Sequence, residues 1–360
     1  MATMAAGRAK PLSRLIPNAR ILLFLSLASL AAAQEPGIAT CDDSRSASLR
    51  DEARGAFQKR QYEQAALQFR QAFEACPQKS ALLLELSDAQ AHGRHFPEAI
   101  RAAQQFLESQ HGSVPGRLAL ANAYFMARRF DEARQEIALV LQADPAQPAA
   151  LKLRGNIEYL VGEFDHAEDT FITLLDKHPR DEEAPYMLGR IYYQQGRFDY
   201  AIGQFQRALK IDPWSYKAYD NLGLCYQALG DSEMATRHFL TAIKMVEKDH
   251  PDYDWAYANL ANLLLEKGDA QQAFAAASKA ADRNPMSARN FYIGGKALCK
   301  LEKTDLCMNW LERSVSLDPN YPDPLYLLGK VYGQLGQEQK AKQALEKFRE
   351  VKAKAPAVRR

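Results

Sequence analysis

The feature that most constrains the fold of this chain is a sequence pattern that returns every ~34 residues. The order Leu-Gly, Tyr, Gly occurs in MLGRIYYQQGRFDYAIGQF from Met187, in NLGLCYQALGDSEMATRHF from Asn221 and in LLGKVYGQLGQEQKAKQAL from Leu327. The first two copies start one period apart, whereas the third starts three periods and a four-residue insertion after the second. Nine frames of this period, with the insertion near Asp249, cover residues 46–355. The frames start at residues 46, 80, 114, 148, 182, 216, 254, 288 and 322.

Each frame contains the markers of two packed helices. Position 8 is always Ala, Ser or Gly, and position 20 is Ala in eight frames and Cys307 in the other, so two helices can approach closely there. Position 24 is mostly a large apolar residue, such as Phe205 or Leu311. A glycine such as Gly196 follows the first amphipathic run, where a helix end favours positive φ, and a proline such as Pro213 stops the second. Each frame is therefore predicted to form a helix, a tight turn, a second helix and a stop.

This order of Leu-Gly, Tyr, Ala, aromatic, Ala and Pro resembles the tetratricopeptide repeat family over essentially all of residues 46–355. The resemblance implies an all-α fold, a right-handed α-solenoid of about nine helix-turn-helix units. The pentatricopeptide RNA readers, which have a similar period, differ from this chain in repeat length and in charge. One hairpin of this size cannot bury its apolar face alone, so stability is expected to come from the stacking of neighbouring units.

Three departures from the repeat carry expectations of their own. Gly294 stands where the pattern has Leu, and the pair Gly294-Gly295 should weaken the first helix of the eighth unit, since each glycine in a helix costs about 1 kcal/mol. His111 stands where the second unit should have its proline. The insertion near Asp249 should protrude as a longer loop between units. The charged last helix should form a soluble cap, followed by a disordered tail at residues 356–360.

The segment at residues 1–33 differs from the repeats. Four basic residues precede an apolar run, Ile21–Ala33, which is shorter than the ~20 residues that cross a bilayer. Small residues end this run, which predicts a cleaved signal peptide at residues 1–33 and a linker at residues 34–45. The mature chain is then expected in the periplasm or the secreted space; the alternative is an uncleaved N-terminal membrane anchor. Without this segment 42 basic and 44 acidic residues remain, a balance that does not indicate a nucleic-acid partner.

No combination of residues points to catalysis. The sequence lacks a phosphate-binding P-loop, a GxSxG nucleophile motif and an HExxH zinc motif, and the repeats leave no segment for a separate catalytic domain. The sequence therefore predicts no enzymatic activity and no cofactor. His92 and His95 lie three residues apart without a neighbouring ligand cluster, so we interpret them as solvated turn residues and expect no metal site.

Four of the five cysteines are placed for disulfides. Cys41 precedes the first helix and Cys76 ends the second. These ends are neighbours in an antiparallel hairpin, so an oxidising compartment favours a bond between them. Cys299 and Cys307 flank the turn of the eighth unit and could also bond; alternatively they are two small core residues. Cys225 is expected to be a buried thiol.

In the resembling family, the first helices line the concave face, with positions 2, 5, 9 and 12 of each unit pointing inward. The resemblance implies a peptide-binding groove of aromatic, amide and basic side chains. Its predicted members are Asn122, Phe125, Lys152, Asn156, Tyr159, Tyr186, Arg190, Tyr193, Lys217, Asn221, Trp255, Asn262, Arg289, Tyr292, Lys296 and Tyr326. Rings would hold apolar side chains, amides would hold backbone groups, and cations would hold carboxylates. Alternatively, Tyr159 and Tyr193 pack against adjacent repeats.

Part of the groove matches the carboxylate clamp of this family, which holds the acidic end of a peptide. Lys152 and Asn156 match the first pair of clamp residues, and Lys217 matches a later one. Met187 and Asn221 replace the other two. An acidic peptide end is therefore a candidate ligand, whereas docking to cytosolic chaperones is not expected of an exported chain.

These features lead to three hypotheses for function. The first is a non-enzymatic scaffold of the periplasm or secreted space that binds extended peptide segments or protein partners in its groove, in envelope assembly or secretion. The second is a glycan-binding module whose aromatic rings stack on sugars. The third is a structural spacer or a self-assembling subunit.

Overall fold

The computed structural model describes residues 41–354, which form eighteen helices and no strand. The predicted signal peptide, residues 34–40 of the predicted linker and the predicted tail lie outside this range. The first helix of each unit has an odd number: α1 (Asp43–Gln58), α3 (Leu82–His92), α5 (Val114–Met126), α7 (Pro148–Leu160), α9 (Glu183–Gln194), α11 (Tyr216–Ala228), α13 (Trp255–Glu266), α15 (Ala288–Lys300) and α17 (Pro322–Gln334). The second helix has an even number: α2 (Tyr62–Ala75), α4 (Phe96–Ser109), α6 (Phe130–Ala143), α8 (Phe164–Lys177), α10 (Phe198–Ile211), α12 (Ser232–Asp249), α14 (Ala270–Arg283), α16 (Thr304–Leu317) and α18 (Glu338–Lys354).

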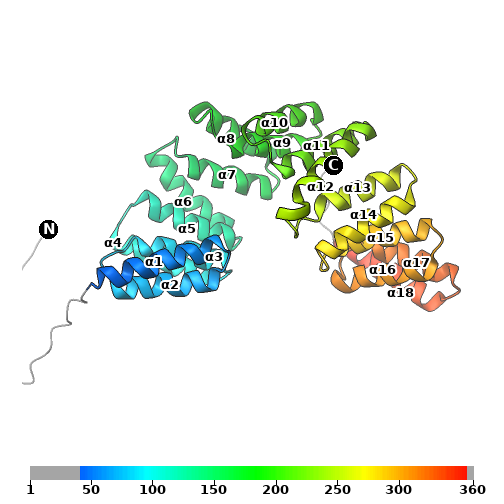
Figure 1. The fold of residues 1–360 in the computed structure, drawn as a ribbon, viewed down its shortest axis with the longest axis horizontal. Coiled ribbons are helices and arrows are strands. Elements are labelled where there is room, and N and C mark those ends of the chain that lie inside the picture. Colours follow the sequence, from blue (N-terminus) through cyan, green and yellow to red (C-terminus); the bar gives the residue numbers. More distant parts are fainter. Residues whose placement is uncertain (1–40, 355–360) are drawn as a thin grey trace, which may run out of the picture.

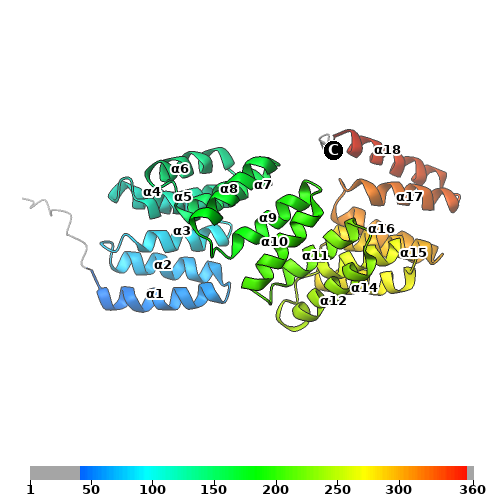
Figure 2. The ribbon, with the colours of Figure 1, turned by 90° about the horizontal axis from the view of Figure 1, so that it is seen from above.

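Consecutive helices pair into hairpins, and the hairpins stack in chain order into a curved solenoid (Figure 1). The stack forms an arch with α1–α6 at one end, α7–α10 across the top and α11–α18 at the other end. The view from above shows the ends displaced sideways as well, so that α17 and α18 lie far from α1 (Figure 2). The predicted all-α solenoid is confirmed. The first hairpin begins at Asp43, three residues before the first frame, and each later hairpin lies within one frame.

The small residues at positions 8 and 20 of each frame lie where the two helices of a hairpin meet. In the fifth unit Gly189 and Ala201 are both buried. A Cβ atom added to Gly189 would lie 2.6 Å from the ring of Phe205, at position 24. Gly155 faces the ring of Phe171 in the same way, also at 2.6 Å. The missing side chain at position 8 therefore makes room for the large ring at position 24.

The turn within each hairpin has a residue with positive φ at position 15. Five units place glycine there, for example Gly162 at φ 83°. The other four units place Arg60, Arg94, Arg128 and Glu302 there, at φ values of 59–65°. This left-handed conformation costs a residue with a Cβ atom roughly 1–2 kcal/mol. These four turns therefore carry backbone strain that glycine would avoid.

The four-residue insertion adds a helical turn, so the prediction of a protruding loop is wrong. α12 has 18 residues, whereas α10 has 14. Four residues are close to one turn of an α-helix, so the insertion keeps the apolar face of α12 in register and buries Val246 completely. Arg283 of α14 donates to the carbonyl oxygens of Val246, at 3.3 Å, and His250, at 3.1 Å. These bonds satisfy backbone groups at the end of the longer helix.

The departure at Gly294 also has a structural reason. α15 is continuous through Gly294 and Gly295. A Cβ atom at Gly294 would overlap the ring of Trp310 on α16. No other unit has a tryptophan or another residue of that size at this frame position. The leucine of the repeat is therefore absent because Trp310 occupies its space.

The solenoid ends in α18, which is rich in Lys, Glu and Gln. Among its residues only Val351 is buried, which is the behaviour expected of a terminal cap. Within residues 41–354 no helix combines the length and the apolar character needed to cross a bilayer.

Candidate peptide-binding groove

A cavity of about 360 Å³ opens on the first helices of units four to seven. We call it the tyrosine cavity. Its lining residues are Tyr159, Tyr186, Arg190, Tyr193, Gln194, Lys217, Asp220, Asn221, Leu224, Tyr253, Trp255 and Asn259. All belong to α7, α9, α11 or α13 except Tyr253, which lies in the loop before α13. Seven predicted groove residues meet here: Tyr159, Tyr186, Arg190, Tyr193, Lys217, Asn221 and Trp255.

Arg190 provides one of the two cations of the tyrosine cavity. Its guanidinium carbon lies 4.5 Å from the ring centre of Tyr159 and 5.9 Å from that of Tyr186. The guanidinium also donates to the Tyr159 hydroxyl at 3.1 Å. No carboxylate within residues 41–354 forms an ion pair with Arg190. A guanidinium that is held by rings and lacks a carboxylate keeps its charge available to a ligand.

Lys217 provides the second cation and is exposed. Its Nζ atom lies 5.9 Å from the ring centre of Tyr216, and it has no ion-pair partner in the described part of the chain. Asn221, one turn later on α11, donates to the Tyr186 hydroxyl at 3.3 Å and to the Lys217 carbonyl oxygen at 2.8 Å. The amide thus links α11 to α9 beside the two free cations.

The tyrosine rings serve both the cavity and the core. Tyr159 lies against Phe164 with ring centres 5.7 Å apart, and Tyr193 lies against Phe198 at 5.5 Å. Both tyrosines also pack on the hydrophobic core of units four to six. Burial raises the pKa of the Tyr193 hydroxyl above its usual value. Tyr159 and Tyr193 therefore both line the groove and pack in the solenoid. This packing fixes the positions of their rings before a ligand binds.

A buried hydrogen-bond network supports the tyrosine cavity, and none of it was singled out from the sequence apart from Arg289. The Asp220 carboxylate is 3% exposed and accepts hydrogen bonds from the Tyr253 hydroxyl at 2.7 Å and from the Asn259 amide at 2.9 Å. Asn259 in turn accepts a hydrogen bond from Arg289 at 2.7 Å. Burial raises the pKa of Asp220, although its two hydrogen bonds oppose the shift. Because both carboxylate oxygens are engaged, Asp220 shapes the cavity and offers no free anion to a ligand.

The repeat pattern could have indicated one member of this network. Asp220 stands at position 5 of the sixth frame, the inward position that Tyr186 occupies in the fifth frame. Asp220 was not predicted because the predicted set contained only aromatic, amide and basic residues. No frame position predicted Tyr253, because it lies in the loop before the seventh frame. Arg289 does not line the cavity. Its guanidinium carbon lies 4.9 Å from the ring centre of Trp255, and burial lowers the pKa of the Arg289 guanidinium.

A second cavity, of about 460 Å³, lies on units two to five and contains Asn122, Phe125, Lys152 and Asn156 from the predicted set. Lys152 forms ion pairs with Asp181 at 2.7 Å and with Glu183 at 3.6 Å. Burial alone would lower the pKa of Lys152, but these two carboxylates outweigh burial and raise it. The charge of Lys152 is therefore compensated within the protein.

The partial carboxylate clamp is not assembled in the structure. Asn156 donates to Glu183 at 3.3 Å, the same carboxylate that pairs with Lys152. Lys217 lines the tyrosine cavity, which does not include Lys152 or Asn156. The interpretation of these three residues as one clamp is therefore corrected, because two of them already hold an internal carboxylate and the third lies in another cavity.

The remaining predicted residues, Asn262, Tyr292, Lys296 and Tyr326, line neither cavity. Tyr292 lies against Tyr321 with ring centres 5.4 Å apart, and Tyr326 lies against Phe348 at 5.3 Å. Asn262 and Lys296 are half-buried. The groove that the structure supports therefore extends over units two to seven.

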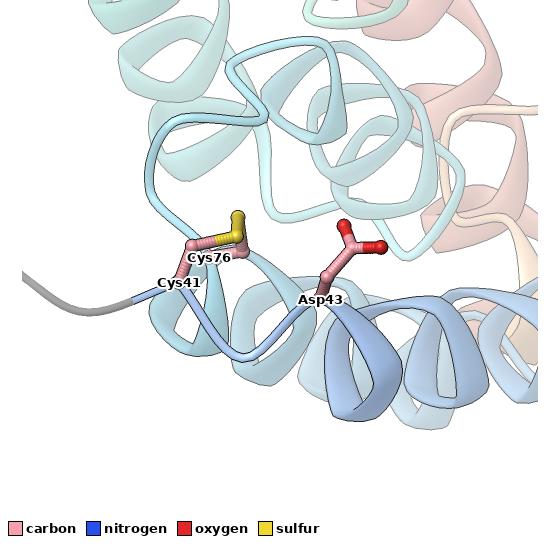
Figure 3. A group of neighbouring side chains, drawn as sticks. All are labelled: Cys41, Asp43 and Cys76. Carbon is pink, nitrogen blue, oxygen red and sulfur yellow. A yellow bond between two sulfur atoms is a disulfide. The ribbon is translucent and has the colours of Figure 1, made fainter.

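Both predicted cysteine pairs form disulfides in the structure. Cys41–Cys76 joins the chain two residues before α1 to the end of α2, with Cα atoms 4.1 Å apart (Figure 3). Cys299–Cys307 joins the end of α15 to the start of α16, with Cα atoms 5.1 Å apart. Cys225 is a buried free thiol, and burial raises its pKa to about 12.

Figure 3 also shows Asp43 beside the first disulfide. The ligand-type atoms of Cys41, Asp43 and Cys76 lie within 4.8 Å of one another. The sulfur atoms of a disulfide are not thiolates, however, and the Asp43 carboxylate pairs with Lys79. This group therefore does not offer a metal the ligands it needs. Of the two turn histidines considered in the sequence, His95 has its Nε2 atom 2.6 Å from a carboxylate oxygen of Glu63.

Five family models described as tetratricopeptide repeat or TPR repeat match most of the solenoid. They match residues 50–113, 94–157, 189–230 together with 295–336, 215–285, and 322–353. The chain belongs to the tetratricopeptide repeat family. Membership in this family of generally non-enzymatic repeats supports a protein–protein interaction scaffold.

Curated proteins give no match to the sequence. Among solved structures, this tetratricopeptide repeat chain is similar to a chain in the crystal structure of the APC/C hetero-tetramer Cut9-Hcn1, with a TM-score of 0.61 and 17% identity. The likeness covers 79% of this chain and 55% of that one, so the chain spans about half the length of this relative. The crystal structure of MamA matches with a TM-score of 0.41 and 22% identity over 46% of this chain and 95% of MamA. At 17% identity the likeness to the Cut9-Hcn1 chain shows the fold alone.

Proposed function

We propose that this protein is a non-enzymatic scaffold that binds extended segments of partner proteins in the tyrosine cavity. The observation that supports the proposal is the combination of fixed aromatic rings with two cations, Arg190 and Lys217, that lack carboxylate partners in the described chain. Rings of this kind bind apolar side chains, and the cations bind acidic side chains. Because the rings are already packed in place, binding costs little conformational entropy.

A peptide library displayed on phage tests this function. Peptides selected on the wild-type protein are measured against a variant that carries Arg190→Gln, Lys217→Gln and Trp255→Ala. None of these three side chains belongs to the buried core, so the variant should melt within a few degrees of the wild type. Loss of the cavity's cations and its exposed ring should weaken binding at least about tenfold.

A matched control carries Arg237→Gln, Lys244→Gln and Leu240→Ala on α12, which contributes no residue to the cavity. This control should bind the selected peptides like the wild type. Undiminished affinity in the cavity variant contradicts the proposal. If no peptide is selected and a glycan array gives cavity-dependent binding instead, the glycan hypothesis replaces it.

We further propose that the mature chain works outside the cytoplasm, in the periplasm or the secreted space, in support of envelope assembly or secretion. The signal-like sequence at residues 1–33 and the two disulfides support this location, because disulfides persist in oxidising compartments. Mass spectrometry of the protein from fractionated cells tests it. We expect a chain without residues 1–33 in which only Cys225 reacts with a thiol reagent after denaturation. A full-length, membrane-bound chain supports the anchor instead, and reduced cysteines contradict export.

A further inference from the structure

Three exposed arginines lie in the turns of the first three units. Arg60, Arg94 and Arg128 each have position 15 of their unit, between the first helix and the second. Equivalent residues of stacked repeats lie side by side, one repeat apart, so these side chains form a row. We call it the arginine row. Within residues 41–354 none of the three guanidinium groups forms an ion pair. Three positive charges are therefore presented to solvent without compensation.

The backbone gives an independent sign that these arginines have a function. Their φ values are 59°, 65° and 60°, in the left-handed region where five other units place glycine. Strain of this kind is concentrated at functional sites, because a side chain that costs stability is retained only for another reason. Glu302 carries the same strain in the eighth unit, but it is an isolated acidic residue. Fold stability alone does not account for arginine at this position in three consecutive units.

The turns that carry the arginine row are basic as a group. Residues 58–62, 92–96 and 126–130 contain five Lys or Arg residues and no Asp or Glu. Five of the corresponding turns in the other six units contain an acidic residue. Just beyond these turns Glu63 contacts His95, Glu132 pairs with Arg129, and Asp131 forms no ion pair in the described chain. The three turns themselves carry net positive charge along one edge of the N-terminal units.

The end of α1, where the arginine row begins, lies at the opening of the arch (Figure 1). Figure 1 shows the C-terminal ends of α1 and α3 turned toward the opening of the arch, with α12 across from them. From above, the same ends point toward α10 and α12 (Figure 2). Burial raises the pKa of Tyr216 on α11, and the charge of Arg60 opposes that shift. Tyr216 directly precedes Lys217 of the tyrosine cavity.

We propose that the arginine row is a second contact for the bound partner, and that this partner is an acidic polypeptide segment extending from the tyrosine cavity across the arch. The inference rests on the proposed function and adds the charge of the ligand to it. An extended segment of about ten residues spans roughly 35 Å, which is enough to contact several repeats. Aromatic rings at one end and cations at both fit a chain with apolar and acidic side chains, whereas a polyphosphate has no apolar groups for the rings.

Exchange of the three arginines for glycine tests the inference, because glycine removes the charges and also relieves the backbone strain. The variant Arg60→Gly, Arg94→Gly, Arg128→Gly should melt no lower than the wild type. The probe is a fluorescein-labelled peptide of about 16 residues in which Glu alternates with Leu and Ala, and binding is read by fluorescence anisotropy in ~50 mM salt. We expect about tenfold weaker binding and a shallower dependence on salt. The same peptide with Gln in place of Glu should bind both proteins weakly.

Two further variants serve as controls. Glu302→Gly relieves the same strain without removing a cation, and Lys342→Gln, Lys347→Gln, Lys354→Gln on α18 removes three cations far along the chain from the row. Both should bind the Glu peptide like the wild type; weaker binding by the α18 variant overturns the inference. Full affinity in the arginine-row variant also overturns it, while the proposed function stands if the tyrosine-cavity variant loses binding. Full affinity in both variants overturns both. Arginine-dependent binding of a sulfated oligosaccharide as tight as that of the Glu peptide overturns the assignment to a polypeptide.

Discussion

At the scale of single residues, the close packing of a hairpin depends on glycine at the helix crossing, because glycine leaves room for the ring of the facing helix. A Cβ atom at Gly189 of α9 would lie 2.6 Å from the ring of Phe205, whereas a Cβ atom at Gly203 of α10 would have no heavy atom within 4 Å. Gly189→Leu should therefore overpack the helix crossing and lower the free energy of unfolding by roughly 1–3 kcal/mol. Gly203→Leu should raise it by up to about 1 kcal/mol, because leucine favours a helix more than glycine does. Thermal melting of the two variants checks this, and equal shifts in one direction would refute the hairpin frame.

A single buried carboxyl should give the stability of the protein a distinctive pH dependence. Burial raises the pKa of Asp220 in the folded state, so the folded protein binds this proton more tightly than the unfolded chain does. The resulting stabilisation is present at pH values below the unfolded pKa of about 4 and is lost as the pH rises through the raised folded pKa. Asp220→Asn should remove this component. Urea unfolding of both proteins between about pH 4 and pH 7 measures it, and parallel curves for the two proteins would contradict the assignment.

At the scale of elements, α12 shows how a helix absorbs an insertion. Its added turn depends on Arg283, which donates to the carbonyl oxygens of Val246 and His250. Arg283→Met should leave these groups without that donor and lower stability by about 1–3 kcal/mol, with faster amide exchange in the last turn of α12. Arg237→Met, on the exposed side of the same helix, should change stability by less than about 0.5 kcal/mol. Similar losses in the two variants would show that Arg283 does not hold this helix end.

The first disulfide should act on the first hairpin alone. Cys41–Cys76 closes a segment with a sequence separation of 35 residues and ties the start of α1 to the end of α2. Replacement of both cysteines by serine should cost about 2–4 kcal/mol. Because neighbouring repeats are coupled only through their interfaces, hydrogen exchange should accelerate in α1 and α2 and stay unchanged in α17 and α18. Uniform acceleration along the whole chain would contradict this local role.

The positions of the helices could be predicted from the sequence because small residues, glycines and prolines repeat at fixed spacing, and each has a local physical reason. The groove could be predicted only in part. Frame position indicated that Tyr186 and Arg190 point inward, but it could not reveal that Lys152 is paired with Asp181, which comes from the loop between units. Nor could it predict Tyr253, because that residue lies in the loop before the seventh frame and not at an inward position of a first helix. Such pairings depend on how neighbouring units are rotated, which the repeat does not encode.

At the scale of the whole molecule, the curvature of the solenoid brings distant units to one space. The ends of α1 and α3 face the opening of the arch that α11 and α12 border (Figure 1). The tyrosine cavity lies on α7, α9, α11 and α13, whereas the arginine row lies in the turns after α1, α3 and α5, so the two regions come from different units. Curvature in a repeat protein follows from a small rotation at each interface between units. The affinity of a partner that contacts both regions would therefore depend on the curvature of the whole stack.

The central claim is that partners bind inside the arch, at the tyrosine cavity. Site-specific photo-crosslinking in the cell of origin tests it most directly, with benzoylphenylalanine in place of Tyr193 in the cavity or of Leu240, which is 51% exposed on α12. We predict that the probe at position 193 crosslinks to a discrete protein, that the crosslink disappears when Arg190→Gln and Lys217→Gln are added, and that the probe at position 240 gives none. Crosslinks from position 240 alone, or crosslinks from position 193 that survive loss of both cations, would contradict the account.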